Sequence, residues 1–300
     1  MDLTRPLGTV WVTGANYTYT RGSSLDVIRA PNRDPSGLLR IEGVEPFLWE
    51  TSEGQSRLHS ATFRLQRRQV KGLGGGVDYT LARSRDNAPS IGGGAGGGNS
   101  AIVAQNDQDL AAEWALSSFD RRQRVNANVN YDLPWGPNRP WLNNGGKLAN
   151  LFEGWRATAT LTIDSGTPLT ARIQNASRDV SQGVTGALRA DYDGAPIQIS
   201  NPTINQFFNT GAFSVPAAGA FGTSARNVII GPGSKQLNAQ FSRDVRLGGT
   251  RALTIQMRVN NLLNNVNFAA VDTNVNSPTF GEVLSVRSMR SAQLNLRFRF

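Results

Sequence analysis

The sequence contains no cysteine, a single histidine and very few lysines. The absence of cysteine excludes a disulfide scaffold and thiol chemistry. One imidazole, that of His59, gives little support for a metal site or a serine–histidine triad. Lys71, Lys147 and Lys235 are the three lysines, so 28 of the 31 basic residues are arginines, and the formal net charge is +9. We therefore expect a basic protein that is not an enzyme, with no catalytic residue, cofactor or metal.

Long runs of one residue class are also missing. The longest unbroken basic runs are pairs such as Arg67-Arg68, so the charge is scattered, and we expect no nucleic-acid partner. No stretch approaches the ~18–20 apolar residues that a membrane helix needs. With 39% hydrophobic residues the composition resembles that of a soluble protein. A membrane β-barrel has the same composition, because each strand presents only every second residue to lipid.

Apolar and polar residues alternate strictly in many places. In the last strand the apolar residues Leu294, Leu296, Phe298 and Phe300 are separated by polar ones. A strand has a side-chain period of two, so this pattern predicts one apolar and one polar face. The pattern recurs over 124–132, 155–164 and 251–260, and more weakly over 9–20, 39–51, 58–68, 75–84 and 237–247. We expect about nine antiparallel strands, several of them close to the ~9–11 residues of a tilted membrane strand.

The polar face of these strands consists of Asn, Gln, Thr, Arg and Asp. Such a face is too hydrophilic to pack against a second sheet, which favours a water-filled lumen over a sandwich core. The charged residues that we expect to face this lumen are Arg124, Asp132, Arg156, Asp164, Arg258 and Arg297. We expect these arginines to pair with Asp132 or Asp164, and we place His59 in the lumen or at a rim.

Connection lengths give the strands a direction. Membrane barrels have short periplasmic turns and longer outer loops. If the last strand runs toward the periplasm, 248–250 and 69–72 are periplasmic turns. The outer loops are then 86–118, 167–236 and 264–288. Three segments break the alternation, because 21–38 and 136–153 are long for turns and 52–56 is short for an outer loop.

The aromatic residues fit the same direction. Tryptophan and tyrosine prefer membrane interfaces, where one edge of the ring is apolar and the other wet. At the inferred periplasmic rim lie Trp135, Trp141, Phe152, Trp155, Phe298 and Phe300. Near the outer rim lie Trp49, Trp114 and Phe119.

An ordered series of short segments resembles one family. The segments are Trp49-Glu-Thr-Ser-Glu-Gly-Gln-Ser-Arg57, Val77-Asp-Tyr-Thr-Leu-Ala-Arg-Ser-Arg-Asp86, Phe119-Asp-Arg-Arg-Gln-Arg124, Tyr131-Asp-Leu-Pro-Trp135, Gly154-Trp155, Ser165-Gly-Thr-Pro-Leu169, Gly211-Ala-Phe213, Asn227-Val-Ile-Ile-Gly-Pro-Gly233, Asn261-Leu-Leu-Asn264 and Asn267-Phe268. Over about residues 7–300 the chain resembles the C-terminal part of the barrel of TonB-dependent outer-membrane transporters. The similarity is to the Oar-like group, which carries a carboxypeptidase-regulatory-like domain.

This resemblance implies a fold, a location and partners. The fold would be an antiparallel transmembrane β-barrel, usually of about 22 strands, plugged by an N-terminal domain. The location would be the Gram-negative outer membrane, with its lipid as a partner. The TonB complex would energise the full-length protein through an N-terminal box, and the arginines of the lumen could contact the plug. The terminal aromatics Phe298 and Phe300 would form the signal that the barrel-assembly machinery reads.

The sequence shows no plug, TonB box or signal peptide. We therefore expect residues 1–300 to be the C-terminal portion of a barrel domain, as a truncated gene product or a fragment of a longer protein. About nine strands leave two open sheet edges, so the missing N-terminal barrel and plug segments are expected partners. By itself the polypeptide is expected not to transport.

The long outer loop contains the residues that could contact a ligand. These are Asn201, Asn205, Phe207, Phe208 and Asn209. Amide and aromatic side chains suit a saccharide or a peptide, and the family resemblance adds a siderophore. Two alternatives stay open, namely a passive porin or structural barrel, and a soluble β-sandwich that binds a ligand.

Overall fold

The computed structural model describes almost entirely β-structure. The described residues are 2–32, 40–45, 47–88, 91, 103–137, 139–143, 146, 149, 152–173 and 187–300. Two short 3₁₀ helices lie at Leu110–Glu113 and Thr210–Ala212. Within the described residues no helix is long and apolar enough to cross a membrane.

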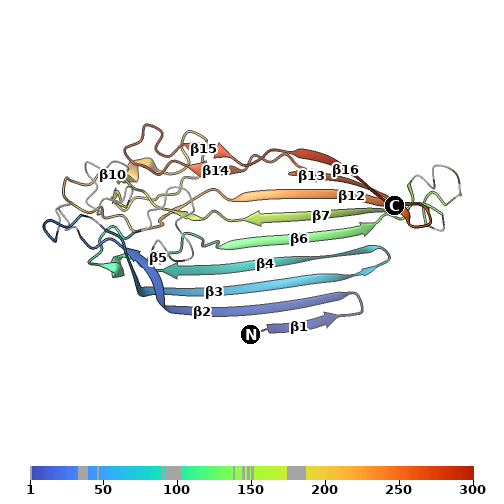
Figure 1. Cartoon of the computed structure of the whole chain (residues 1–300), viewed down its shortest axis with the longest axis horizontal. Coiled ribbons are helices and arrows are strands. Elements are labelled where there is room, and N and C mark those ends of the chain that lie inside the picture. The colour runs from blue at the N-terminus through green and yellow to red at the C-terminus, as the bar shows by residue number, and fades with distance from the viewer. Residues whose placement is uncertain are drawn as a thin grey trace.

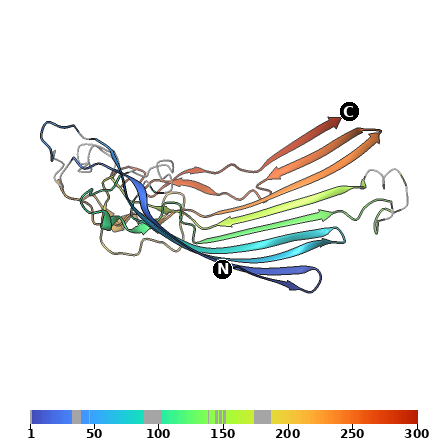
Figure 2. The same ribbon diagram turned by 60° about the horizontal axis from the view of Figure 1, so that its bottom comes forward.

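One antiparallel sheet forms the body of the molecule. Its nine principal strands are β1 (Asp2–Leu7), β2 (Trp11–Arg29), β3 (Trp49–Val70), β4 (Leu73–Asp86), β6 (Gln123–Asp132), β7 (Trp155–Asp164), β12 (Ser234–Gly248), β13 (Arg251–Asn260) and β16 (Ser291–Arg299). They pair strictly in chain order, and the short β5 (Ala115–Leu116) pairs with β4. The sheet is curved and open, with β1 and β16 at its two edges (Figures 1 and 2). An all-β antiparallel sheet that is part of a barrel was the predicted fold, and it is confirmed.

The two ends of the sheet differ. At one end, which we call the turn end, short turns join β3 to β4 and β12 to β13, and β16 stops beside them. At the other, the loop end, lie three small two-stranded sheets (Figure 1). Their strands are β8 (Pro168–Leu169), β9 (Asp191–Tyr192), β10 (Phe213–Ser214), β11 (Ile229–Ile230), β14 (Phe268–Val271) and β15 (Val283–Val286). We call residues 103–122, 165–173, 187–233 and 261–290 the loop module.

The prediction of a separate strand at 39–51 is wrong. The described residues between 40 and 48 are not in a strand, and Trp49–Val70 is one strand that includes the expected loop at 52–56. Its first residues pair with the end of β2, for example Thr51 with Val27. The first residues of β3 lie beyond the body of the sheet, where neither face of the strand has to be apolar. The alternation that identifies strands therefore disappears there. The short β1 was missed for a related reason, because six residues carry too little pattern.

This correction removes two of the three irregular connections. The β2–β3 connection, residues 30–48, is at the loop end, and the β1–β2 turn spans only residues 8–10. Connections at the turn end are therefore short, with the exception of 133–154. The expected alternation of short turns and long loops now extends to the N-terminal strand.

The register divides the sheet into two chemically distinct faces. Ala15, Phe63, Tyr79, Val125 and Ile163 stand opposite one another across five strands. Directly opposite residues point to the same side, so this row lies on one face, which we call the apolar face. The neighbouring row, on what we call the polar face, consists of Asn16, Thr62, Thr80, Arg124 and Asp164.

Large apolar side chains on the apolar face are exposed among the described residues. Leu294 and Leu296 of β16 are 63% and 64% exposed, and Phe63 of β3 is 54% exposed. Soluble monomers rarely expose a continuous apolar surface of this extent. The main buried core of the described residues instead lies in the loop module, around Phe208 and Phe213.

Candidate functional site

Cross-strand ion pairs organise the polar face. Arg124 donates from Nε to Asp164 Oδ1 at 2.6 Å, and Arg121 Nη1 lies 3.2 Å from the other oxygen of the same carboxylate. At the turn end Arg156 Nε donates to Asp132 Oδ1 at 2.7 Å. The predicted pairing of Arg124 and Arg156 with Asp164 and Asp132 is confirmed. Register explains it, because each pair sits directly opposite on β6 and β7.

Arg258 and Arg297 do not follow that prediction. They lie on β13 and β16, strands that do not adjoin β6 or β7, and neither has an ion pair within the described residues. Arg258 Nη2 donates weakly to Gln240 Oε1 at 3.4 Å, and Arg297 stands opposite Thr254. The polar face thus becomes more cationic toward the β16 edge.

A further pair was not anticipated from the sequence. Arg64 Nε of β3 donates to Asp78 Oδ1 of β4 at 2.7 Å. Both side chains are largely exposed, so the pair contributes only about 0–1 kcal/mol to stability. The pair holds the opposite charges of Arg64 and Asp78 side by side on the solvated polar face.

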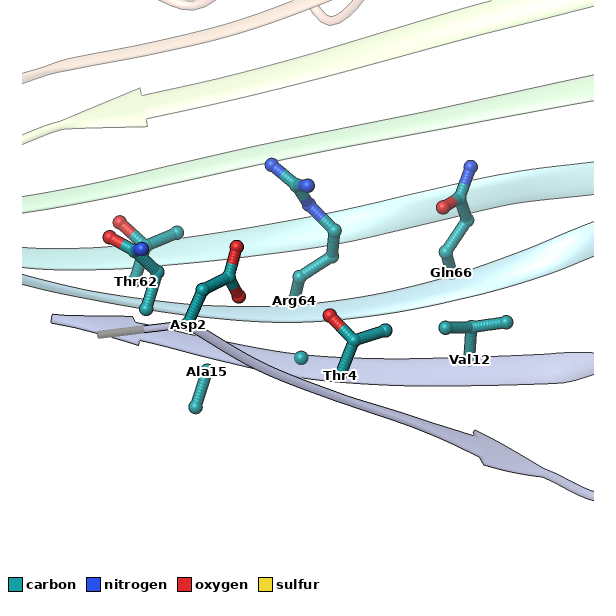
Figure 3. Close-up of a pocket in the computed structure, with 9 residues that line it drawn as sticks. Asp2, Thr4, Val12, Ala15, Thr62, Arg64 and Gln66 are labelled. Atoms are coloured by element: carbon teal, nitrogen blue, oxygen red, sulfur yellow. The ribbon is translucent and has the colours of Figure 1, made fainter.

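The polar face is hollowed beside the β1 edge. The hollow measures about 360 Å³ and is lined by Asp2, Thr4, Asn16, Arg64 and Gln66, among others. Figure 3 shows Asp2 and Thr4 of β1 and Arg64 and Gln66 of β3 rising from the same side of the sheet, while Ala15 points to the other side. This open, charged trough suits water and polar solutes rather than an apolar ligand.

Aromatic side chains gather at the turn end. The rings of Trp135 and Phe152 meet edge to face at 5.9 Å, and those of Phe298 and Phe300 stack at 6.2 Å. Trp155 begins β7 at the same end, whereas Trp49 begins β3 at the loop end. The aromatic residues therefore lie near opposite ends of the strands, as the sequence predicted.

The loop module has a packed aromatic core. Phe208, Phe213 and Phe280 meet edge to face, with ring centroids 5.3–6.2 Å apart. Phe208 is only 2% exposed. We therefore correct its assignment as a ligand contact, because a ligand could reach it only if the module opened. The sequence could not show this, since Phe280 lies 72 residues further along the chain.

The other four predicted ligand contacts differ in how strongly they take part in the packing and hydrogen bonding of the loop. Phe207 is half-buried, and its backbone N–H donates to Gly281 O at 2.8 Å. Asn209 is also half-buried and donates from Nδ2 to Pro196 O at 3.0 Å. Asn201 and Asn205 are exposed, beside the 59% exposed Ile204. These last three are accessible to a ligand.

A buried ionic network holds the loop module together, and no pattern in the sequence predicts it. Glu113 accepts a 2.5 Å hydrogen bond from Arg189 Nη1, and its other oxygen lies 3.7 Å from Arg226 Nε. Arg226 also pairs with Asp86, and all four residues are buried. Gln105 adds a neutral link, because its Oε1 accepts from the backbone N–H groups of Arg189 and Gly222.

A second charged pair stabilises the turn after β14. Burial lowers the pKa of Arg172 to about 10, although the charge of Asp272 opposes this effect. Burial raises the pKa of Asp272, but hydrogen bonds from Ser277, Asn274 and Thr279 outweigh it and lower the pKa overall. Both groups therefore stay charged at neutral pH. Arg172 Nε also donates to Asn274 Oδ1 at 3.1 Å, so the pair is part of the loop scaffold.

Among the described residues, no group of three or more metal-ligating side chains lies close enough to hold a metal ion. The candidate binding surfaces are therefore the polar face and the exposed tip of the loop module.

Comparisons with known proteins agree with this architecture. A family described as "Outer membrane beta barrel domain" matches residues 1–293. Among solved structures, the outer membrane transporter YddB from Escherichia coli is similar with a TM-score of 0.54 and 11% identity. The alignment covers 98% of this chain but only 31% of the transporter, so the chain spans less than a third of that protein's length. A comparison with curated proteins gives no match. The protein is located in the outer membrane, and the chain belongs to the outer membrane beta-barrel domain family.

Proposed function

We propose that this chain forms part of the wall of a TonB-dependent transporter that takes up a solute across the outer membrane. The observation that carries the proposal is the two-faced open sheet, with exposed leucines on one side and paired charges on the other. In this arrangement the apolar face contacts lipid and the polar face lines a wet lumen. The likeness to an outer-membrane transporter supports the same fold.

The open edges of the sheet indicate that further strands are needed to close the barrel. Among the described strands β1 pairs only with β2, and β16 pairs only with β13. A membrane sheet must close, because unpaired backbone groups in hydrocarbon cost several kcal/mol each. We propose that further barrel strands of the full-length protein pair with both edges and that a plug meets the polar face. Arg297, which has no ion pair within the described residues, would then be available to the plug.

The loop module is the proposed site of solute capture. Its loop end would face outward, and Asn201, Ile204 and Asn205 are exposed on it. Amide groups beside an apolar side chain suit a saccharide, a peptide or a siderophore. We assign no chemical step to the chain, so its role is binding and passage rather than catalysis. Phe298 and Phe300 would serve the barrel-assembly machinery, and the TonB complex would supply the energy.

Conductance and uptake together test this function. The complete protein encoded by the gene, reconstituted in a planar bilayer, should show almost no steady ion current because a plug fills the lumen. A host that carries the gene should accumulate one of three probes, a ferric siderophore, an oligosaccharide or a short peptide. Deletion of the host's TonB should abolish that accumulation. A steady current with uptake that does not depend on TonB would instead establish a passive porin.

A further inference from the structure

Three arginines form a row across the apolar face near its loop end. Arg21 of β2 stands directly opposite Arg57 of β3, which stands directly opposite Arg85 of β4. On the same face, two residues along the strands toward the turn end, Arg83 stands opposite His59. We call Arg21, Arg57 and Arg85 the arginine row. Directly opposite side chains in an antiparallel sheet have Cβ atoms only about 4.5–5.5 Å apart, so three positive charges are held close together.

The arginine row lacks an internal counter-charge. Like charges directly opposite each other destabilise a sheet. Within the described residues none of the three has an ion pair, although seven other arginines in that part of the chain do. The Nε of Arg85 is buried without an acceptor there, and the Arg57 guanidinium lies 5.5 Å from the Trp114 ring centroid. A buried donor without a partner needs an explanation, and a bound anion would supply one.

The position of the row matches the outer boundary of a membrane. On the same face of β3, Arg67 lies ten residues away toward the turn end. At ~3.3 Å per residue and a strand tilt of about 40°, this separation is a height of roughly 25 Å, the height of the apolar band of a membrane barrel. Leu65, Phe63, Ala61 and, nearest the arginine row, His59 lie between the two arginines on this face. The arginine row would thus stand at the level of the outer headgroups.

The residues next to the row have the character of a membrane interface. The Tyr17 hydroxyl and His59 Nδ1 are 2.8 Å apart, and the Tyr19 and His59 rings lie 4.9 Å apart. All three side chains are exposed on the apolar face. Tyrosine favours the depth at which hydrocarbon gives way to headgroups. His59 is therefore at a rim, one of its two predicted places, and it faces away from the lumen.

We propose that the arginine row binds the phosphate groups of a phosphorylated lipid headgroup in the outer leaflet. Guanidinium groups bind phosphate through paired hydrogen bonds, and several of them can share one headgroup. The acyl chains of the same lipid would lie along Ala61 and reach toward Phe63, which is 54% exposed. The inference rests on the apolar face contacting lipid, as proposed above, and it does not depend on what the lumen transports.

The test compares two double variants of the complete protein. Arg21→Gln/Arg57→Gln removes two exposed members of the row, and Arg5→Gln/Arg67→Gln removes the same charge from the same face at the turn end. The probes are bisphosphorylated lipid A and lipid A without phosphates, titrated onto detergent-solubilised protein and counted by native mass spectrometry. We expect the row variant to bind the phosphorylated probe at least about tenfold more weakly, since a charged hydrogen bond contributes roughly a factor of ten. The turn-end variant should bind as the unchanged protein does.

Three results would overturn the proposal. They are equal affinities of the two double variants, equal affinity for the two probes, and saturation of the site by inorganic phosphate alone. If the row variant does not fold, judged by the heat-dependent gel mobility of barrels, the single variant Arg83→Gln replaces it with a loss expected in the same direction. A barrel that proved to be a passive porin would still have this lipid site, so the two tests fail separately.

Discussion

Leu296 and Asn295 are neighbours in β16 whose side chains point to opposite faces. Leu296 stands opposite Ile255 on the apolar face, and Asn295 stands opposite Gln256 on the polar face. Leu296→Arg should destabilise the complete barrel by about 2–4 kcal/mol at mid-membrane depth, falling to ~0–1 kcal/mol toward the rim. Asn295→Arg should change the stability much less, because the polar face is wet. A urea titration of refolding into lipid vesicles measures both, and equal losses would contradict the assignment of the two faces.

Single residues were predictable where the strand pattern governs them. Arg124 and Asp164 lie on adjacent strands of similar length, so their pairing follows from alternation and pairing in chain order. Phe208 was not predictable, because a phenylalanine in a loop is as compatible with a binding surface as with a core. What decides its place is contact with Phe213 and Phe280, and the sequence contains no pattern for that contact.

The loop module depends on Glu113, the buried acceptor for Arg189 and the near neighbour of Arg226. Glu113→Gln removes the charge while keeping the shape, and breaking a buried ion pair costs about 3–5 kcal/mol. We expect hydrogen–deuterium exchange to rise strongly over 187–230 and to stay unchanged in β7. The exposed Glu50→Gln is the matched control, with an expected effect within about 0.5 kcal/mol. Exchange that rose equally in β7 would mean that the module and the sheet unfold together.

Strands were predictable in the body of the sheet and not beyond it. Trp155–Asp164 has the bounds that its alternation predicts. By contrast, the first residues of Trp49–Val70 pair with β2 outside the body of the sheet, where neither face must be apolar. Hydrogen bonding alone extends the strand there, and it leaves no periodic signal in the sequence. The buried Arg226 and Asp86 were missed because 140 residues separate them.

At the scale of the whole molecule, the main sheet of the described residues has two unpaired edges, formed by β1 and β16. Expressed alone and added to lipid vesicles, the polypeptide of residues 1–300 should aggregate or assemble into oligomers rather than insert as a monomer, because hydrocarbon cannot satisfy an open edge. Crosslinking and a dye-leakage assay check this expectation. A monomer that inserted and released the dye would show that β1 and β16 can pair with each other.

The class of the fold could be predicted, since alternation, connection length and aromatic placement all depend on the same membrane geometry. The arginine row could not. Arg21, Arg57 and Arg85 are three unremarkable residues in the sequence, and only the register places them opposite one another. The continuous register of β2 and β3 ends just past Arg21, at an irregularity between Gly22 and Leu25 that alternation does not reveal.

The hydrogen bonds of Gln105 restrict how the loops of such a barrel can change during evolution. The single side chain of this residue bonds to the backbone of Arg189 and Gly222, so the connection after β4 is tied to the connection after β7. Neither connection can be replaced separately without leaving buried amide and carbonyl groups unsatisfied. New binding specificity would therefore arise either from small changes at the exposed tip, such as Asn201 and Asn205, or from exchange of both connections as one inherited block.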